Sequence, residues 1–439
     1  MKPTAYFALA HPHDAAIYLP AVNGMYNSVF QQGIPESRSW PKGLALDDLA
    51  FWSGNSRLWN HKFALHSLGN YSVQSSPTGP MFAGPQRNFT LVGDSGGFQI
   101  GKGSLSVLIG LQAGMSGTDA VMAWGNNFNA KQWIVNMLEA NVDYAITIDM
   151  PLWAMTQAGV KSPFHNCTED QLLGMTVENL TMIEEVMDPE GPKWLNVIHG
   201  TNPANTVRWW DAVKHFRHGG WSLAGAAGWR GGLANMLSTV LRMRDEQAFD
   251  TGNDWVHVLG VSQLGWHIFL TAIQQQLRAI NPQLQFSYDS ATPFTSACER
   301  DEYLLLPRLG RDLSDWSMQF NTYEAYQSDA DANNPRLFAV PSPVGRHFML
   351  HHLTINGAKM ATRRVDNLTH AILANHNVWT YLEAARIATG QAFIPGAPNI
   401  PATYWQAIDF IKDVFQAQNW ASEIEANKGM LDQAAASKY

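Results

Sequence analysis

Three aspartates and one histidine follow short apolar runs in this 439-residue chain, and each can take part in proton transfer or nucleophilic attack. They are Asp94, Asp149, His199 and Asp289. Two carboxylates in different environments can divide the work, one as an acid and base and the other as a nucleophile. The pattern therefore predicts a catalytic site, provided that the fold brings these residues together. An aspartate after a strand also commonly caps the next helix, and for each one taken alone this alternative stays open.

A glycine-rich string, Asp-Ser-Gly-Gly-Phe-Gln, begins at the first of these aspartates. Two adjacent glycines let a backbone approach a ligand closely, and an aromatic ring beside them offers a face to a flat heterocycle. The candidate ligand-binding residues here are Ser95, Gly96, Gly97 and Phe98, with Asp94 at the edge of the ligand.

Each of these residues follows a strand-like run, and such runs alternate along the chain with amphipathic, helix-length segments. Such alternation predicts parallel βα units. Six units are clear, and there is room for two more in the first ninety residues and the C-terminal third, so a closed (β/α)₈ TIM-type barrel fits best. A dinucleotide fold is disfavoured because no G-x-G-x-x-G follows the first strand. The strand-like runs are residues 88–93, 144–148, 194–198, 221–224, 255–259 and 284–288, and the helical segments include 131–139, 168–185 and 265–280.

In a barrel of this type the carboxyl ends of the strands form the active face, which would bring the four residues to one mouth. We expect residues 1–327 to form the barrel with its active site. Residues 328–439 then hold a turn-rich excursion over 328–343 and a C-terminal helical region that completes the barrel. That region includes a helix over 375–390 and a proline-rich link over 393–401.

Composition narrows the class of protein. With 29 Lys and Arg against 37 Asp and Glu, the formal charge is −8, so any polyanion must meet a local basic face. The two cysteines, Cys167 and Cys298, can supply neither a disulfide framework nor an all-thiolate zinc site. No stretch approaches the ~20 apolar residues of a membrane span. We expect a cytoplasmic protein with no membrane partner.

The string at Asp94 resembles the signature of the tRNA-guanine transglycosylase family, whose members exchange a guanine for a 7-deazaguanine base. Other segments follow in the family's order over roughly Leu91 to Ala388. The resemblance implies that Asp94 does the acid and base work and that Phe98 stacks on the base. It further implies that Asp149, in Ala-Ile-Thr-Ile-Asp-Met-Pro, reads the guanine edge. Asp289, in Asp-Ser-Ala-Thr-Pro, is then the nucleophile that forms an ester with the sugar.

Two departures concern the base pocket. His199 stands where the family has a glutamine, which would change the base substituents that are accepted. Gly225, in Leu-Ala-Gly-Ala-Ala-Gly, loosely matches a family stretch of backbone contacts to the base, and residues 231–233 offer a competing alignment.

Two further departures concern the polymer and the metal. The family's arginine in a P-T-R string, which reads the anticodon, is replaced by Phe294 and Thr295 after Pro293. The three cysteines of the family's structural zinc site are missing, and only the matching histidine, His376, remains. We therefore expect no zinc at that position and no cofactor, and we expect His376 to be a hydrogen-bonded structural residue.

These departures resemble the DNA-modifying branch of the family, found in phages and bacteria. If the chain is encoded by a phage, the resemblance implies that it acts in the host cytoplasm. We expect guanine in DNA to be replaced by a 7-deazaguanine base such as preQ0 or a relative. A tRNA enzyme, a non-catalytic nucleic-acid-binding homologue and an ordinary barrel glycosidase remain alternatives, and a homo-oligomer stays open. The expected phosphate contacts are Arg300, Arg308 and Arg311, with a second basic segment at Arg346, His347, Lys359, Arg363 and Arg364; solvated surface charge is the alternative for both.

Overall fold

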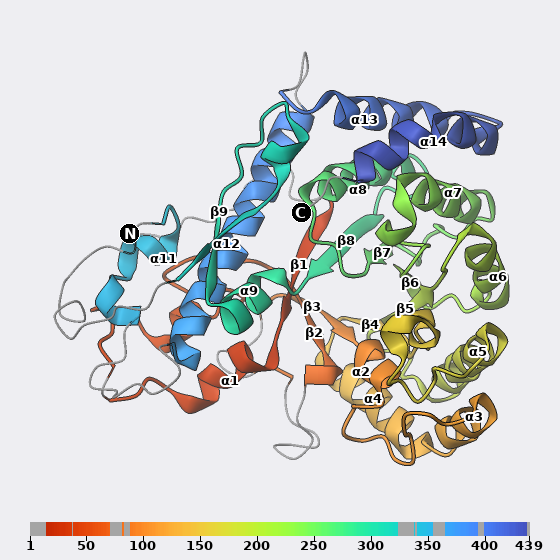
Figure 1. Ribbon diagram of the computed structural model, residues 1–439, viewed down its shortest axis with the longest axis horizontal. Coiled ribbons are helices and arrows are strands. Elements are labelled where there is room, and N and C mark those ends of the chain that lie inside the picture. Colours follow the sequence, from red (N-terminus) through yellow and green to blue (C-terminus); the bar gives the residue numbers. More distant parts are fainter. Residues whose placement is uncertain are drawn as a thin grey trace.

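Eight parallel strands close into a barrel that helices surround, so the expected α/β barrel is confirmed (Figure 1). The structure, a computed structural model, describes residues 15–36, 38–70, 81–82, 88–323, 338, 340–353, 365–393 and 399–436. Each strand pairs with the next along the chain, and the last pairs with the first. The strands are β1 Ile17–Val22, β2 Phe63–Ser67, β3 Thr90–Asp94, β4 Tyr144–Ile146, β5 Lys193–Ile198, β6 Gly219–Leu223, β7 Trp255–Val258 and β8 Gln285–Ser290.

All six strand-like runs of the sequence overlap barrel strands, β3 to β8. Both remaining strands, β1 and β2, lie in the first ninety residues. Within the part of the chain that the structure describes, the C-terminal third adds no strand to the barrel. The expectation of a strand there was wrong, because that region is used for helices that cover the sheet.

Successive strand residues point alternately into the barrel and towards the helices. Among the described residues, the inner core is a small separate cluster of nine buried side chains, and the outer core between strands and helices is much larger. In β8, for example, Phe286 and Tyr288 belong to the outer core. Ser287 and Asp289 alternate with them and therefore face the interior. A strand residue that faces inward near the carboxyl end thus arrives at the barrel mouth.

The helices that follow the strands form an outer layer. The predicted helical segments 131–139, 168–185 and 265–280 fall within or largely overlap α4 Phe128–Asn141, α5 Glu169–Val186 and α8 Leu264–Leu277. Helix α5 begins at a capping box in which Thr168 and Gln171 satisfy each other's backbone N–H groups. The other barrel helices are α1 Gly24–Gln32, α2 Gly97–Lys102, α3 Gly117–Gly125, α6 Pro203–Val213, α7 Gly232–Asp245 and α9 Thr292–Arg300.

The C-terminal third packs onto the outside of the barrel (Figure 1). The long helix α12, Asn367–Ala392, contacts α8, α9 and α1, and therefore covers the side where β8 meets β1. Helices α13 Ala402–Val414 and α14 Trp420–Ala435 pack on α8 and α7. The short α11, Pro343–His347, also contacts α12.

An antiparallel ribbon, β9 Glu302–Leu305 with β10 Gln319–Thr322, leaves the barrel after α9. Most of the predicted excursion over 328–343, and its boundary with the barrel, lie outside the described residues. No helix in the described ranges combines the length and hydrophobicity that a membrane span requires.

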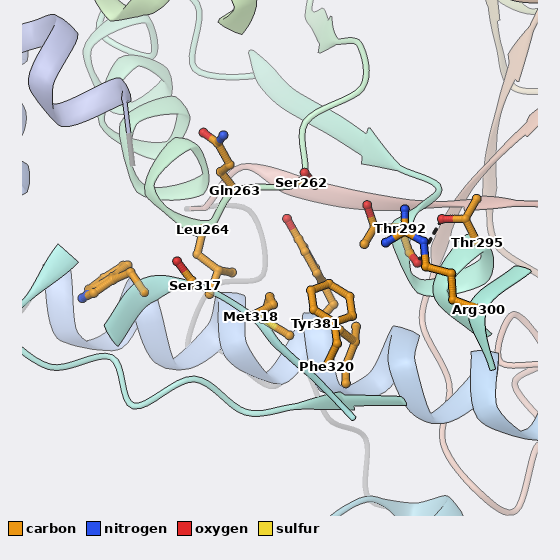
Figure 2. A pocket seen from close by; sticks show the side chains of 12 residues that line it. Ser262, Gln263, Leu264, Thr292, Thr295, Arg300, Ser317, Met318, Phe320 and Tyr381 are labelled. Carbon is orange, nitrogen blue, oxygen red and sulfur yellow. Dashed lines mark hydrogen bonds between the residues drawn. The ribbon is translucent and has the colours of Figure 1, made fainter. Parts of the chain in front are cut away.

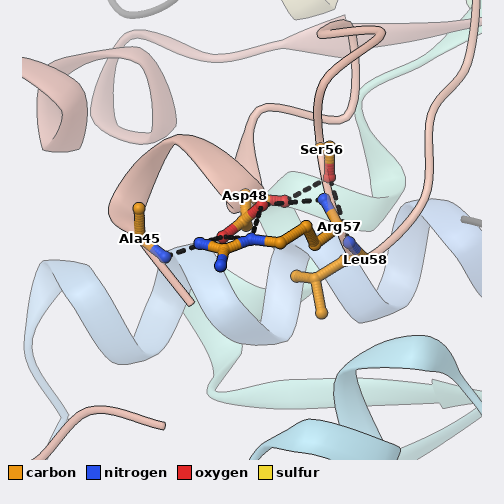
Figure 3. A network of polar contacts seen from close by, with 5 residues as sticks. All are labelled: Ala45, Asp48, Ser56, Arg57 and Leu58. Atoms are coloured by element: carbon orange, nitrogen blue, oxygen red, sulfur yellow. Dashed lines mark hydrogen bonds and ion pairs between the residues drawn. The ribbon is translucent and has the colours of Figure 1, made fainter. Parts of the chain in front are cut away.

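The long connection between α1 and β2 is held by one buried carboxylate, Asp48 (Figure 3). Its oxygens accept hydrogen bonds from the backbone N–H groups of Ala45 and Arg57 and from the Arg57 guanidinium. The Ser56 hydroxyl donates to the backbone carbonyl of Asp48 at 2.7 Å. These bonds fix a loop that is not held by strand pairing in the described structure. The loop carries large aromatic side chains into the outer core.

Candidate active site

Three carboxylates lie at the same end of the barrel. Asp94 is the last residue of β3, Asp149 follows β4 closely and Asp289 lies near the end of β8. Burial, the largest cause, and the charges of Asp149 and Asp289 raise the pKa of Asp94 to about 6, against an opposing hydrogen bond from Ser67. A carboxyl group with this pKa can give and take a proton near neutral pH.

Asp149 is hydrogen-bonded to His199, which follows β5 directly. The Oδ2 atom of Asp149 lies 2.6 Å from Nε2 of His199, and both residues are buried. The imidazole packs edge-on against Trp209, with ring centroids 5.0 Å apart. A Cβ atom on Gly97 would lie 2.7 Å from Oδ1 of Asp149. The absence of a side chain at Gly97 therefore makes room for this pair.

The Asp-Ser-Gly-Gly string turns the chain from β3 into α2. Gly96 adopts the left-handed conformation, with φ at 88°, and precedes the first turn of the helix. The Ser95 hydroxyl donates to the carbonyl of Thr147 at 3.1 Å, so it ties this turn to the end of β4. The structure therefore uses the Ser95 hydroxyl for support of the site.

Phe98 is 54% exposed and is the aromatic face that the string presents to solvent. Its ring is tilted against that of Trp153, with centroids 5.4 Å apart, and Nζ of Lys102 lies 4.2 Å from the Phe98 centroid. A flat ligand can stack on such a face, and the lysine adds a positive charge beside it.

Asp289 is oriented through one of its two oxygens. Its Oδ1 atom accepts the backbone N–H of Gly260 at 2.7 Å. The Nε2 atom of His257 lies 3.2 Å from the same oxygen. His257 is fully buried in β7, two residues before the end of the predicted run.

Gly225 lies in the loop after β6, with φ at +58°. A Cβ atom there would lie 2.4 Å from the carbonyl oxygen of Gly200, the residue after His199. Gly225 thus lets the loops after β5 and β6 pack closely together at the mouth.

A cavity of about 300 Å³ adjoins the mouth on the side of β7 and β8 (Figure 2). Its walls come from the loop before α8, from α9, from the β9–β10 region and from α12. Figure 2 shows Tyr381 between Arg300 and Ser317. The volume is at the lower end of the ~300–1,000 Å³ range of small-ligand sites, so one flat group fits better than a large ligand.

The three predicted phosphate contacts are spread along this side. All three arginines are exposed. Arg300 lines the cavity, and Arg311 donates to the Asn399 side chain at 3.1 Å. Of the second basic segment, Arg346 and His347 belong to α11. Lys359, Arg363 and Arg364 lie outside the described residues.

His376 is buried in α12 and both of its ring nitrogens are engaged. Nε2 lies 2.8 Å from the carbonyl oxygen of Leu304 in β9, and Nδ1 lies 2.8 Å from the hydroxyl of Ser342. Among the described residues, no group of three or more histidine, cysteine, aspartate or glutamate side chains could hold a metal ion.

Sequence reasoning did not single out three residues that contact the predicted site residues: Ser67, Trp153 and His257. His257 had a signal, because it alternates with Trp255 in a predicted strand and must share its face. Ser67 had none, because the strand that carries it was not identified.

A scan of the chain against models of known protein families gives no match, and a search of curated proteins also gives none. Function is therefore inferred from the motifs and from the geometry of the mouth.

Proposed function

We propose that this chain is a base-exchange glycosyltransferase, similar to tRNA-guanine transglycosylases, that replaces guanine in DNA with a 7-deazaguanine base such as preQ0. The observation that carries the proposal is the common mouth of Asp94, Asp149 and Asp289, in which Asp94 has a pKa of about 6. The proposed reaction needs one group that exchanges protons near neutral pH and a second carboxylate that can bond to the sugar.

In the first step, the Asp289 carboxylate bonds to C1′ while the bond from C1′ to guanine N9 breaks. The electron pair of the broken bond leaves with the guanine, and protonated Asp94 gives that base a proton. In the second step, ionised Asp94 removes the N9 proton of the incoming base, which attacks C1′. The ester bond then breaks and its electron pair returns to Asp289. Two displacements at C1′ retain its configuration.

Base recognition falls to groups carried just beyond the ends of β3, β4 and β5. Phe98 and Trp153 supply aromatic faces, and Asp149 with His199 supplies a hydrogen-bonding edge. A guanine edge presents N–H donors, which suits the carboxylate. His199 stands where the family has a glutamine. The most direct consequence is that the pocket accepts a different substituent at position 7 of the base.

DNA is proposed as the polymer because the arginine string that reads an anticodon is absent. Duplex DNA hides C1′, so the target nucleotide must leave the stack or lie in an open strand. The cavity, whose lining includes Thr292 shortly after Asp289, has Arg300 and aromatic side chains in its walls and so has the chemistry to hold part of an unstacked strand.

The β9–β10 ribbon and α12 are proposed to stand in place of the family's zinc-bearing subdomain. Hydrogen bonds of His376 with the Leu304 carbonyl in β9 and with the Ser342 hydroxyl support this assignment, since they join the ribbon to the helix without a metal. Elemental analysis that finds stoichiometric zinc, absent from His376→Ala, would contradict it.

The test is exchange of radiolabelled guanine into DNA and into tRNA, together with trapping of a protein–DNA adduct that survives denaturation. We expect exchange into DNA, and we expect Asp289→Asn to abolish both exchange and adduct. Asp413→Asn is the matched control, because Asp413 is an exposed aspartate on α13, outside the barrel. Label in tRNA alone would favour the tRNA alternative, and undiminished exchange by Asp289→Asn would refute the mechanism.

A further inference from the structure

We infer that His257 is a positioning residue for Asp289: its imidazole places an N–H beside Oδ1 and leaves Oδ2 as the oxygen that bonds to the sugar. The inference rests on the proposed function and deepens it. It starts from a row of polar side chains inside the barrel, on β7 and β8, in which His257 is the register partner of Ser287. Asp289 lies two residues further along β8, on the same inward face.

The row fixes the protons of the imidazole. The indole nitrogen of Trp255 can only donate, and it donates to the Ser287 hydroxyl oxygen at 2.7 Å. The other hydrogen-bond partner of that hydroxyl among the described residues is Nδ1 of His257, at 2.9 Å. The hydroxyl proton therefore goes to Nδ1, and in a neutral imidazole the remaining proton is on Nε2.

One carboxylate oxygen, Oδ1 of Asp289, lies close to this Nε2 proton. Nε2 of His257 is buried and has no hydrogen-bond partner in the described part of the chain. Oδ1 of Asp289 lies 3.2 Å from it, and the same oxygen already accepts the Gly260 N–H. The Gly260 donor bonded to Oδ1 and the imidazole donor beside that oxygen together turn the carboxylate so that Oδ2 is left to bond to C1′.

The two donors act differently on the two chemical steps. They stabilise negative charge on the carboxylate, which disappears when the ester forms and is restored when the ester breaks. His257 therefore helps chiefly the second step, in which the bond between C1′ and Oδ2 breaks and its electron pair returns to Asp289.

The experiment measures the rate constants of adduct formation and breakdown separately, with a guanine-containing oligodeoxynucleotide and a chase of free guanine. In His257→Leu we expect breakdown to slow about 100-fold, formation to change less than about tenfold, and the adduct to accumulate. His257→Gln, whose amide N–H reaches a similar place, should recover breakdown to within about tenfold of wild type. His376→Gln is the control, a second buried histidine whose nitrogens bond elsewhere.

A structural role alone would lower formation and breakdown together in His257→Leu, and that result would overturn the inference, as would wild-type breakdown. Nitrogen-15 NMR of the imidazole reports the tautomer without any turnover. We expect the Nε2–H tautomer to predominate in wild type and to lose that predominance in Ser287→Ala. An Nδ1–H tautomer in wild type would contradict the proton positions assigned to the row. If the wild type forms no adduct, the proposed function fails, and the NMR result still decides the tautomer.

Discussion

At Asp94 the proposed chemistry is gained at a cost in folding free energy. Burial first, and then the neighbouring carboxylates, raise its pKa from 3.8 to about 6. Between these values the folded protein binds more protons than the unfolded chain, so the free energy of unfolding decreases as pH rises from about 4 to 6. Above that window the loss is complete, of order 3 kcal/mol at most.

We therefore expect Asp94→Asn to be more stable than wild type at pH 7.5, by about 1–3 kcal/mol, and to be inactive in exchange. The difference should disappear near pH 4, where both side chains are neutral. Thermal or urea unfolding at several pH values measures this. A variant that is less stable than wild type at pH 7.5 would contradict the raised pKa.

Gly97 tests the close approach of α2 to Asp149. A methyl group there would meet Oδ1 of Asp149 at 2.7 Å and displace the carboxylate from its place beside His199. We expect Gly97→Ala to lower the exchange rate about 100-fold, since small misplacements of a binding group have effects of this size. Steady-state exchange with a fixed oligodeoxynucleotide measures the loss.

Gly174→Ala is the matched control for that change. Gly174 is exposed in the middle of α5 and has no atom within 4 Å of an added Cβ. It should leave exchange unaltered and raise the free energy of unfolding by up to about 1 kcal/mol, because alanine favours a helix. Normal exchange by Gly97→Ala would show that Asp149 is not held as described.

Among the elements, α12 connects the last part of the chain to the first. Asn375 is fully buried; its Oδ1 accepts the indole N–H of Trp59 at 2.7 Å and its amide donates to the Leu49 carbonyl at 2.7 Å. Arg38 donates to the His352 carbonyl at 3.0 Å and pairs with Asp366 at the start of α12. The helix is thereby held in register, which places Tyr381 at the cavity.

We expect Asn375→Leu to lower the free energy of unfolding by about 2–4 kcal/mol, because it leaves the buried Trp59 N–H without its acceptor and removes a donor from the Leu49 carbonyl. Urea denaturation provides the measurement. Asn427→Leu on α14, where the amide bonds within its own helix, should change it by no more than about 0.5 kcal/mol. Equal effects of the two changes would mean that the buried amide does not hold α12.

For the whole molecule, the formal charge of −8 opposes DNA binding, so a local basic surface has to overcome it. Arg300 lies at the cavity, and the turn that carries Arg308 and Arg311 leads to Trp316 in its wall. This side of the barrel, next to β7 and β8, is therefore the place where we expect the strand to run.

Replacement of Arg300, Arg308 and Arg311 by glutamine should raise the DNA dissociation constant and flatten its dependence on salt. Removal of one phosphate-binding charge lowers the slope of log K against log salt by about 0.7 to 0.9, the lower value for single strands. Fluorescence anisotropy at several salt concentrations measures this, and calorimetry with free guanine serves as the control. Unchanged affinity and slope would place the footprint elsewhere, and equal weakening of guanine binding would indicate a damaged fold.

The sequence by itself determined the fold class and most of the barrel strands. Local hydrophobic patterns report which side of a segment is buried, and strands β3 to β8 have clear apolar runs. They also place Asp94, Asp149, His199 and Asp289 at or just beyond strand ends. Strands β1 and β2 escaped detection, since Pro20 interrupts one and His66 lies within the other.

Only the tertiary structure decided how these residues act on one another. The pKa of Asp94, the pairing of Asp149 with His199 and the row from Trp255 to Asp289 all depend on distances between segments far apart in the chain. The same holds for the attachment of α12 through Asn375. Electrostatic and hydrogen-bond energies fall off within a few ångströms, and sequence periodicity carries no information at that precision.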